Sequence, residues 1–196
     1  MGQKQHVDIF RKFQLRRVLL KHAGAGAVYV PFIGDGDIAT ELYMERQMIW
    51  GADIDGTRTS TARERLPGAN IITADCDAWP FASTKTPPFA VADFDAYCYP
   101  YTSFRAFWGE APKAKRLVLF FTDGERMGIK RIGHWRHPDG TKGPQLDLKA
   151  RRPIYNMYMQ KVIVPWFRAA IRPYRIIRKM NYLRKDMCYW GSVIER

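Results

Sequence analysis

The sequence is poor in cysteine and contains no long apolar run. Its three cysteines, Cys76, Cys98 and Cys188, are odd in number and far apart, a pattern that fits neither a disulfide framework nor a zinc site. No apolar stretch approaches the roughly 20 residues that a membrane-spanning helix needs. The first residues also lack the apolar core of a secretory signal. We therefore expect a cytoplasmic protein in a reducing compartment.

Acidic residues are scarce relative to basic ones. The chain has 32 Lys and Arg against 19 Asp and Glu, a formal net charge of +13. Such an excess predicts an anionic partner, for which nucleic acid, either DNA or RNA, is the usual candidate. The cations cluster within residues 11–21, 149–152 and 172–185, whereas the acids concentrate between Asp35 and Asp95. A basic surface that serves only solubility is the alternative interpretation.

Length and composition predict a single domain over residues 1–196. A chain of 196 residues that is 46% hydrophobic can bury one sizeable core, which favours one domain over two. We expect a basic N-terminal helix over 7–23, with its apolar residues on or near one side. Residues 130–152 form a loop that is too long and polar for an ordinary connection, and such loops are usually functional or disordered.

Apolar strand patterns alternate with helical patterns through most of the chain. Such alternation predicts a doubly wound α/β fold with a mostly parallel sheet. A helix is expected over about 155–171, and residues 174–182 and 187–194 have the pattern of a closing antiparallel pair. The strands of the parallel part are expected near residues 27–33, 48–54, 69–75, 94–99 and 115–122.

The first expected strand runs into a glycine turn, and the second ends in an acid. Residues 28–33 lead into Gly34-Asp35-Gly36, and Asp53 follows one helix length later. This order is typical of nucleotide-type binding folds, in which glycines let the backbone approach a ligand and the later acid binds a ribose. The combination predicts a cofactor site at this end of the sheet.

The acids in the turn bear on which ligand it binds. Gly34, Gly36 and Ala39 also satisfy the spacing of the dinucleotide fingerprint. A pyrophosphate would lie at the N-terminus of the following helix, where Asp35 and Asp37 would repel it. S-adenosylmethionine carries a sulfonium and an ammonium group and no phosphate, so the sequence favours this cofactor. An NAD-type cofactor and a helix start without a ligand are the alternatives.

The turn also carries a resemblance to a known family. The run from Pro31 to Gly36 is similar to the Pro-Phe-x-Gly-x-Gly form of amino-methyltransferases that act on nucleic-acid bases, and the chain resembles the class I S-adenosylmethionine-dependent methyltransferases. The resemblance implies a Rossmann-like fold in which Asp53 binds the ribose hydroxyls, Asp75 accepts from the adenine amino group and the backbone of Cys76 lies along the ring edge. The implied cofactor is S-adenosylmethionine, and the implied cofactor-binding residues are Pro31, Phe32, Gly34, Asp35, Gly36, Asp53, Asp75 and Cys76.

The fourth expected strand supplies the candidate catalytic residues. In the resembling amino-methyltransferases a polar acceptor and Pro-Pro-aromatic end this strand, where the acceptor holds the target amine and the ring stacks on the flipped base. This chain has Tyr99, Pro100 and Tyr101 there, with Tyr99 in place of the acceptor or the second proline. We expect Tyr101 to stack on the base and the Tyr99 carbonyl to accept from the amine. Asp95 lies too early to be the acceptor, unless the register differs.

Two further features have competing interpretations. Cys98 would attack carbon 6 of a pyrimidine in an enzyme that methylates carbon 5, but a lone cysteine in an apolar strand is usually a core residue. In the long loop, Trp135 and Arg136 are candidates for substrate binding, the ring stacking on a base and the cation contacting phosphate. A surface loop with one anchoring tryptophan is the alternative. His134 and His137 flank the pair, but two imidazoles without a third ligand do not make a metal site.

These observations predict an S-adenosylmethionine-dependent methyltransferase that acts on a base in DNA or RNA. The altered motif at the fourth strand leaves a second interpretation open, a nucleic-acid-binding protein that binds the cofactor without transferring a methyl group. Methylation of an anionic small molecule is the third.

Overall fold

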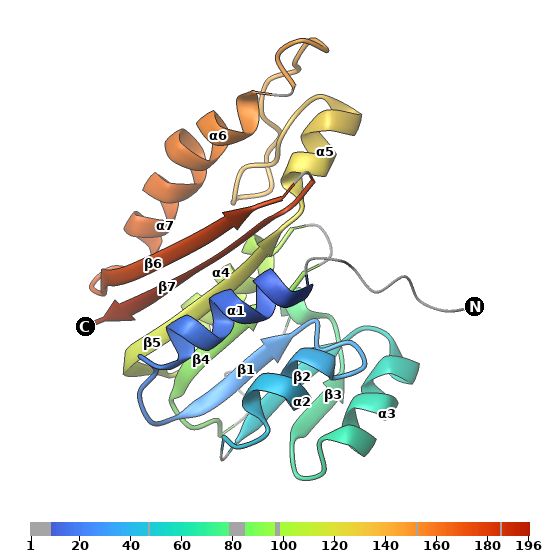
Figure 1. Cartoon of the computed structure of the whole chain (residues 1–196), viewed down its shortest axis with the longest axis vertical. Helices are drawn as coiled ribbons and strands as arrows, with labels where there is room; N and C mark the ends of the chain where they lie inside the picture. The colour runs from blue at the N-terminus through green and yellow to red at the C-terminus, as the bar shows by residue number, and fades with distance from the viewer. Residues whose placement is uncertain (1–8, 47, 79–84, 97–98, 152, 185) are drawn as a thin grey trace.

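The protein is described here by a computed structural model that covers residues 9–46, 48–78, 85–96, 99–151, 153–184 and 186–196. Its strands are β1 (Ala27–Pro31), β2 (Ile49–Asp53), β3 (Asn70–Thr73), β4 (Phe89–Phe94), β5 (Lys113–Asp123), β6 (Arg175–Leu183) and β7 (Cys188–Glu195). In the described residues they form one sheet in the order β3-β2-β1-β4-β5-β7-β6 (Figure 1). Neighbours from β3 to β5 are parallel, and β7 lies antiparallel between β5 and β6. This order confirms the doubly wound α/β fold with a closing antiparallel pair.

Helices cover both faces of the sheet (Figure 1). Helices α1 (Ile9–Leu20), α2 (Asp37–Tyr43) and α3 (Gly56–Arg65) pack on one face, and α4 (Tyr101–Glu110), α6 (Ile154–Tyr158) and α7 (Val164–Ala170) pack on the other. A π-helical turn, Met159–Ile163, joins α6 to α7, and α5 (Glu125–Ile132) follows β5. None of the described helices is long and apolar enough to cross a membrane.

Aromatic rings fill the core beneath α4 and α7. Phe94 of β4 stacks on Phe121 of β5 with ring centroids 5.2 Å apart, and Phe121 stacks on Trp190 of β7 at 4.1 Å. Phe104 and Phe167 close this layer from the helices. The opposite face is aliphatic, with buried Leu, Val and Ile side chains beneath α1 and α2. Strands buried on both faces are typical of parallel sheets, and β1 and β4 are buried along their whole length.

The fourth strand differs from its expected position. The sequence predicts it over 94–99, whereas β4 spans Phe89–Phe94, so Tyr99 lies beyond the strand. The expected strand was placed over a stretch rich in aromatic residues, which have high strand propensity. The observed strand contains a charged residue, Asp93, that is completely buried. Because of this charge, the strand does not have the uninterrupted apolar pattern by which a buried strand is predicted.

The N-terminal helix and the long loop lie close to where the sequence predicts them. Helix α1 begins at Ile9, the first described residue, and ends at Leu20, three residues before the expected end at residue 23. In the expected loop 130–152, the first three residues belong to α5, and residues 133–151 contain no helix or strand apart from one bridge between Arg136 and Lys142.

Asp93 is neutralised by a buried arginine from α1. The Arg16 guanidinium donates two hydrogen bonds to the carboxylate, from Nε at 2.7 Å and from Nη2 at 2.6 Å. The Tyr43 hydroxyl of α2 donates a third at 2.6 Å. Burial opposes the charge of Arg16, but Asp93 raises the pKa of the guanidinium and keeps it ionised. The pair therefore joins α1, α2 and β4 in the middle of the fold.

Arg16→Met should destabilise the fold by about 3–5 kcal/mol, because it leaves the Asp93 charge buried without its partner. The matched control is Arg17→Met on the same helix. Arg17 pairs with Glu41, but both side chains are about half exposed, and such pairs contribute roughly 0–1 kcal/mol. Urea unfolding of the two variants measures the difference. Equal losses would show that the buried pair does not hold α1 to the sheet.

Candidate active site

The glycine turn after β1 has an unusual backbone. Phe32, Gly34 and Gly36 all have positive φ, at 61°, 55° and 84°. A side chain at Gly36 would be strained by this φ, and its Cβ would lie 3.4 Å from the Cα of Ala62. At Gly34 the nearest atoms to an added Cβ are those of Arg58, at 3.8 Å and beyond. The turn is therefore a tight bend whose backbone conformation favours glycine at Gly34 and Gly36.

Asp53 ends β2 beside this turn. Its Oδ2 accepts a hydrogen bond from the Gly34 amide at 3.1 Å, and its Oδ1 accepts from the Asp55 amide at 3.0 Å. An ionised carboxylate has about four lone-pair sites, so each oxygen retains one for a further donor. Two acceptor oxygens side by side fit the two hydroxyls of a ribose. Asp53 also has a structural role, because it holds the turn against β2.

The end of β3 lies against the same turn. The Phe32 amide donates to the Cys76 sulfur at 3.2 Å, and the thiol donates to the Ala52 carbonyl at 3.5 Å. Burial raises the pKa of Cys76 to about 12, so the thiol is neutral at pH 7. Asp75 is exposed, and its carboxylate accepts from the Asp77 amide at 2.9 Å. The structure thus brings the ends of β1, β2 and β3 together, as the cofactor prediction requires.

The two acids of the turn have partners that the sequence does not reveal. Asp35 Oδ1 lies 3.7 Å from Nε of Arg58 on α3, and Asp37 forms an ion pair with Arg65 of the same helix. Each negative charge in the turn is therefore balanced by an arginine. The charge of the turn alone is consequently a weaker guide to the cofactor than the sequence analysis assumed.

Asp95 directly follows β4 at the carboxyl end of the sheet. Its Oδ2 lies 2.5 Å from Lys12 Nζ, and it accepts a hydrogen bond from the Thr122 hydroxyl. Burial opposes the charge, but Lys12 and Arg16 lower the pKa of Asp95, so the carboxylate is ionised at neutral pH. The expectation that Asp95 lies too early on the strand is wrong, because the strand ends at Phe94.

Tyr101 is completely buried at the start of α4. Its hydroxyl donates to Asp123 Oδ2 at 2.5 Å, and its ring packs edge-on against Trp166 and Tyr99. No face of this ring is open in the structure, so Tyr101 packs as a core residue rather than as the stacking platform that the sequence suggests. Pro100 is also buried and precedes the helix as its N-cap.

Tyr99 and Arg136 form a stacked pair. The Arg136 guanidinium lies over the Tyr99 ring, 4.4 Å from its centroid. Glu125 anchors the arginine, accepting from its backbone amide at 2.8 Å and from Nη2 at 3.3 Å. The Arg136 side chain is 44% exposed, and Tyr99 is half-buried. The long loop therefore reaches the end of β4, where the sequence analysis expects it to meet the substrate.

The Trp135 side chain is buried in the core and is not part of this stacked pair. It is 5% exposed, its Nε1 donates to His137 Nε2 at 3.2 Å, and its ring packs against Tyr158 of α6. The ring anchors the loop to the core and offers no free face for a base. Of the two loop residues, only Arg136 is accessible to a substrate in this structure. Cys98, the candidate nucleophile, lies outside the described residues.

Two buried acids at the end of β5 were missed by the sequence analysis. Asp123 is completely buried and accepts from the Glu125 amide at 2.7 Å in addition to Tyr101, and Glu125 is 3% exposed. Burial raises the pKa of Asp123 to about 7 and also raises the pKa of Glu125. The signal available was positional, since Asp123 directly follows the expected strand 115–122, at the edge of the sheet where ligands bind in such folds.

No protein-family model matches this chain, and no curated protein matches it in sequence. Solved structures with the same architecture do. One is the magnesium protoporphyrin IX methyltransferase ChlM from Synechocystis PCC 6803 with bound SAH, at 15% identity and a TM-score of 0.58 over 100% of this chain and 89% of that chain. Another is the N-methyltransferase NodS from Bradyrhizobium japonicum WM9 in complex with S-adenosyl-L-homocysteine, at 12% identity and a TM-score of 0.61 over 98% and 89%. A third is the [4+2]-cyclase SpnF, at 13% identity and a TM-score of 0.57 over 100% and 85%.

These likenesses confirm the Rossmann-like methyltransferase fold. At 12–15% identity they show the fold alone. The reaction must be argued from the site, particularly because one of the three is a cyclase.

The raised pKa of Asp123 makes a prediction about stability. The ordinary pKa is 3.8, and in the fold it is about 7. Between these values the folded protein retains a proton that the unfolded chain releases, so this group lowers the free energy of unfolding as pH rises from about 4 to about 7. Asp123→Asn cannot ionise and should remove this loss. Urea unfolding at several pH values measures it.

Asp139→Asn is the control with the opposite sign. Hydrogen bonds from Thr141 lower the pKa of Asp139, so its small contribution is present at neutral pH and is lost as pH falls below its ordinary range. The raised pKa assigned to Asp123 is wrong if the free energies of unfolding of the wild type and of Asp123→Asn change with pH in the same way between pH 4 and 7.

Proposed function

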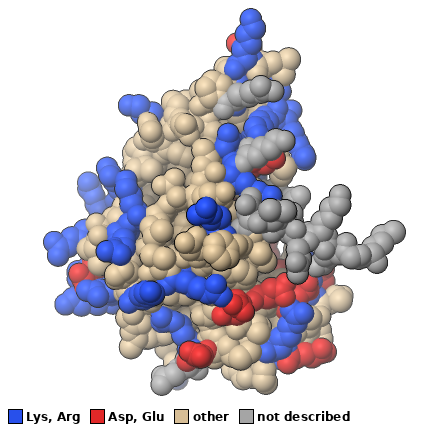
Figure 2. Space-filling model, viewed as in Figure 1, with Lys and Arg blue, Asp and Glu red and all other residues tan. Residues whose placement is uncertain are grey.

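We propose that the protein is an S-adenosylmethionine-dependent methyltransferase that modifies a base in DNA or RNA. The observation that carries the proposal is a division of the carboxyl end of the sheet into two halves. Glycines and acids line the ends of β1, β2 and β3, whereas a half-buried tyrosine and the exposed arginine that covers it lie beyond β4 and β5. In Figure 2, acidic side chains gather on the side of α2 and α3, and the charged side chains in the rest of that view are mostly lysine and arginine.

The first half fits the cofactor. S-adenosylmethionine, when bound, supplies an electrophilic methyl group. Asp53 would hold the ribose through the two lone pairs that its backbone contacts leave free. Asp75 would accept from the adenine amino group, and the backbone of Gly34 would lie against the methionine end. Pro31, Phe32, Asp35, Gly36 and Cys76 would complete this site by shaping the turn around it.

The second half fits a base amine. Asp95 stands at the end of β4, in the region where the resembling enzymes have a polar acceptor, and Lys12 keeps it ionised. As methylation proceeds, the target nitrogen gains a bond to carbon and loses a proton, and a carboxylate there would accept it. The Tyr99 carbonyl is the second acceptor that we assign. Asp95 would thus supply the polar acceptor that the Tyr99-Pro100-Tyr101 motif lacks.

Tyr99 and Arg136 would hold the base. A base that stacks on Tyr99 would take the place of the Arg136 guanidinium, which would move to a phosphate. Base–aromatic stacking contributes roughly 1–3 kcal/mol, enough to offset the loss of one exposed cation–π contact of about 0.5–1 kcal/mol. Trp135 would support this loop from below rather than contact the substrate.

Two alternatives use the same site. A protein that binds nucleic acid and cofactor without transfer is favoured by the closed ring of Tyr101 and by the arginine that covers Tyr99. An anionic small molecule as acceptor would fit the net charge of +13. Incubation with methyl-labelled cofactor and mixed DNA and RNA separates these possibilities. Label in nuclease-digested nucleosides supports base methylation, and cofactor binding without any labelled nucleoside overturns it.

Asp53→Ala should weaken binding of S-adenosylhomocysteine about ten- to a hundredfold, because it removes a charged acceptor worth roughly 1–3 kcal/mol. The control is Asp55→Ala. Asp55 caps α3 by accepting from the Thr57 and Arg58 amides, so its loss costs about 0.5–2 kcal/mol of stability but should leave affinity nearly unchanged. Calorimetry and thermal melting separate the two effects. Equal affinities for both variants would remove Asp53 from the site.

Tyr99→Ala should lower methyl transfer at least about tenfold, the loss of one stacking contact, while affinity for S-adenosylhomocysteine stays close to wild type. Tyr99→Phe keeps the ring and should retain most activity. Tyr101→Ala should instead lower the melting temperature, because it empties a buried position. Initial rates with nucleic acid check the first pair. Full activity in Tyr99→Ala contradicts the assigned role.

A further inference from the structure

A groove runs along the seam between the helical segment α6–α7 and strand β6. It consists of two adjoining hollows of about 290 and 520 Å³ that share Arg168, Ile176 and Lys179 in their walls. Its floor is apolar and includes Phe167 and Trp190. We name this feature the α7–β6 groove, and we infer that it binds a single strand of nucleic acid. The inference rests on the proposed function and identifies the surface that holds the substrate outside the active site.

The rim of the groove is cationic. No acid among the described residues lines either hollow, and Glu195, which lies opposite Arg175 in the sheet, is bonded to Arg116. Five exposed cations lie along it, and they are Arg168, Arg172, Arg175, Arg178 and Lys179. None of Arg168, Arg172, Arg178 and Lys179 forms an ion pair with an acid that the structure describes. The exposed arginines Arg17 and Arg65 on the opposite face are each paired. Cations without partners predict a polyanion.

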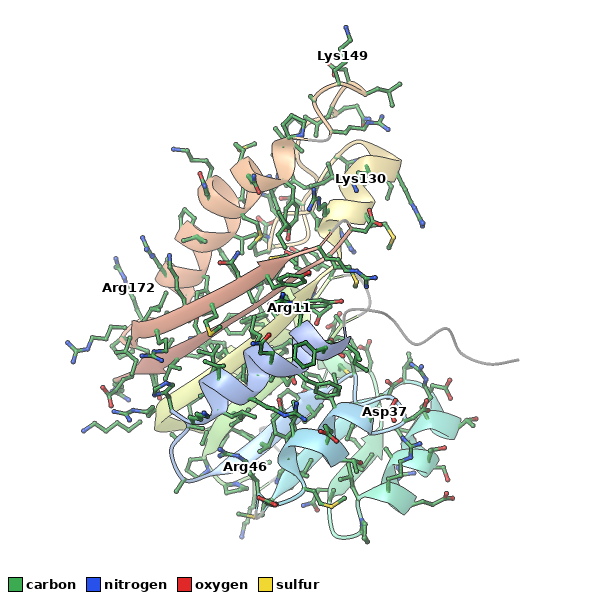
Figure 3. All side chains as sticks on the ribbon, in the orientation of Figure 1. Arg11, Asp37, Arg46, Lys130, Lys149 and Arg172 are labelled. Carbon is green, nitrogen blue, oxygen red and sulfur yellow. The ribbon has the colours of Figure 1, made fainter. Side chains whose placement is uncertain are left out.

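The inner end of the groove lies at the carboxyl end of the sheet. Cys188 lines its inner end and pairs in the sheet with Asp123, the buried acid beside Tyr101. Its outer end lies where β6 begins, and Figure 3 labels Arg172 there. Nine residues of β6 span about 30 Å, enough for several nucleotides. A strand held in the groove would therefore run toward the carboxyl end of the sheet, the same end at which the proposed active site lies.

The shape of the groove favours a single strand over a duplex. A hollow of about 290 Å³ has the size of a small-ligand pocket and admits one base rather than a helix. Trp190 lines this hollow and is 8% exposed. A cationic groove that tracks the sugar–phosphate backbone is one part of the arrangement that binds single strands without sequence preference.

The test measures binding of the full chain to fluorescent oligothymidylate and oligouridylate of about 12 nucleotides, within the usual site sizes of such grooves. The variant Arg168→Ala/Lys179→Ala should bind at least about tenfold more weakly and lower the slope of log affinity against log salt by about 1.4, because two phosphate contacts are lost. Its matched control, Arg17→Ala/Lys21→Ala, removes the same charge from the opposite face and should change affinity by less than about threefold.

A second pair separates shape from charge. Asn181→Trp fills the groove wall without a change of charge and should also weaken binding, whereas Gln14→Trp on exposed α1 should not. Melting temperatures confirm that all variants fold. The inference is overturned if groove and control variants bind alike. It is also overturned if a Glu- and Leu-rich peptide binds there instead of the oligonucleotides, or if Asn181→Trp converts a dimer of the chain into monomers.

The outcome is independent of methyl transfer. Binding is measured without cofactor, so the groove can be confirmed even if no labelled nucleoside forms. Conversely, groove variants that methylate nucleic acid and bind it as the wild type does would leave the proposed function standing and remove the groove from it.

Discussion

Asp93 is a carboxylate inside a strand whose six residues are all buried, and the position is tolerable only because Arg16 reaches it from α1. An unpaired charge there would cost several kcal/mol. The pair fixes where α1 crosses the sheet, and Tyr43 adds α2 to the same point. Since residues four apart lie on one side of a helix, fixing Arg16 also places Lys12 beside Asp95. The Arg16–Asp93 pair that holds α1 on the sheet therefore also positions Lys12, which keeps Asp95 ionised. Asp95 is the residue that we propose binds the target amine.

The elements that the sequence predicts well are those with a local signal. The glycine turn, β1, β2 and the closing pair follow from apolar runs and glycine placement within a few residues of each other. The fourth strand was misplaced because its signal is not local. The partner of Asp93 lies 77 positions away, so nothing near Asp93 in the sequence marks it as a buried residue. Tyr101 and Trp135 were misjudged for the same reason, since α6 and α7 bury them.

The candidate site divides in the same way. Asp53 could be proposed from the sequence because a strand, a glycine turn and an acid recur at a fixed spacing, and in the structure its carboxylate accepts from the amide of Gly34 in that turn. The pairing of Asp35 and Asp37 with α3 was not visible, because it depends on which side of a helix faces the turn. Asp123 and Glu125 were overlooked because an acid after a strand is common. What distinguishes them is burial, and burial is a property of the packed molecule.

The distribution of charge allows one protein to hold two ligands of opposite sign. The arginines of α3 beside the glycine turn are balanced by Asp35 and Asp37, so they do not oppose a cationic cofactor. Arg178 and Lys179 of β6 form no ion pair with an acid that the structure describes, so they attract a polyanion. Six strand spacings of about 4.8 Å separate β3 from β6, roughly 29 Å, whereas salt screens exposed charges beyond about 8 Å. The two edges of the sheet are therefore electrostatically independent. The cations along β6 would therefore act on a strand held in the groove and have little effect at the glycine turn.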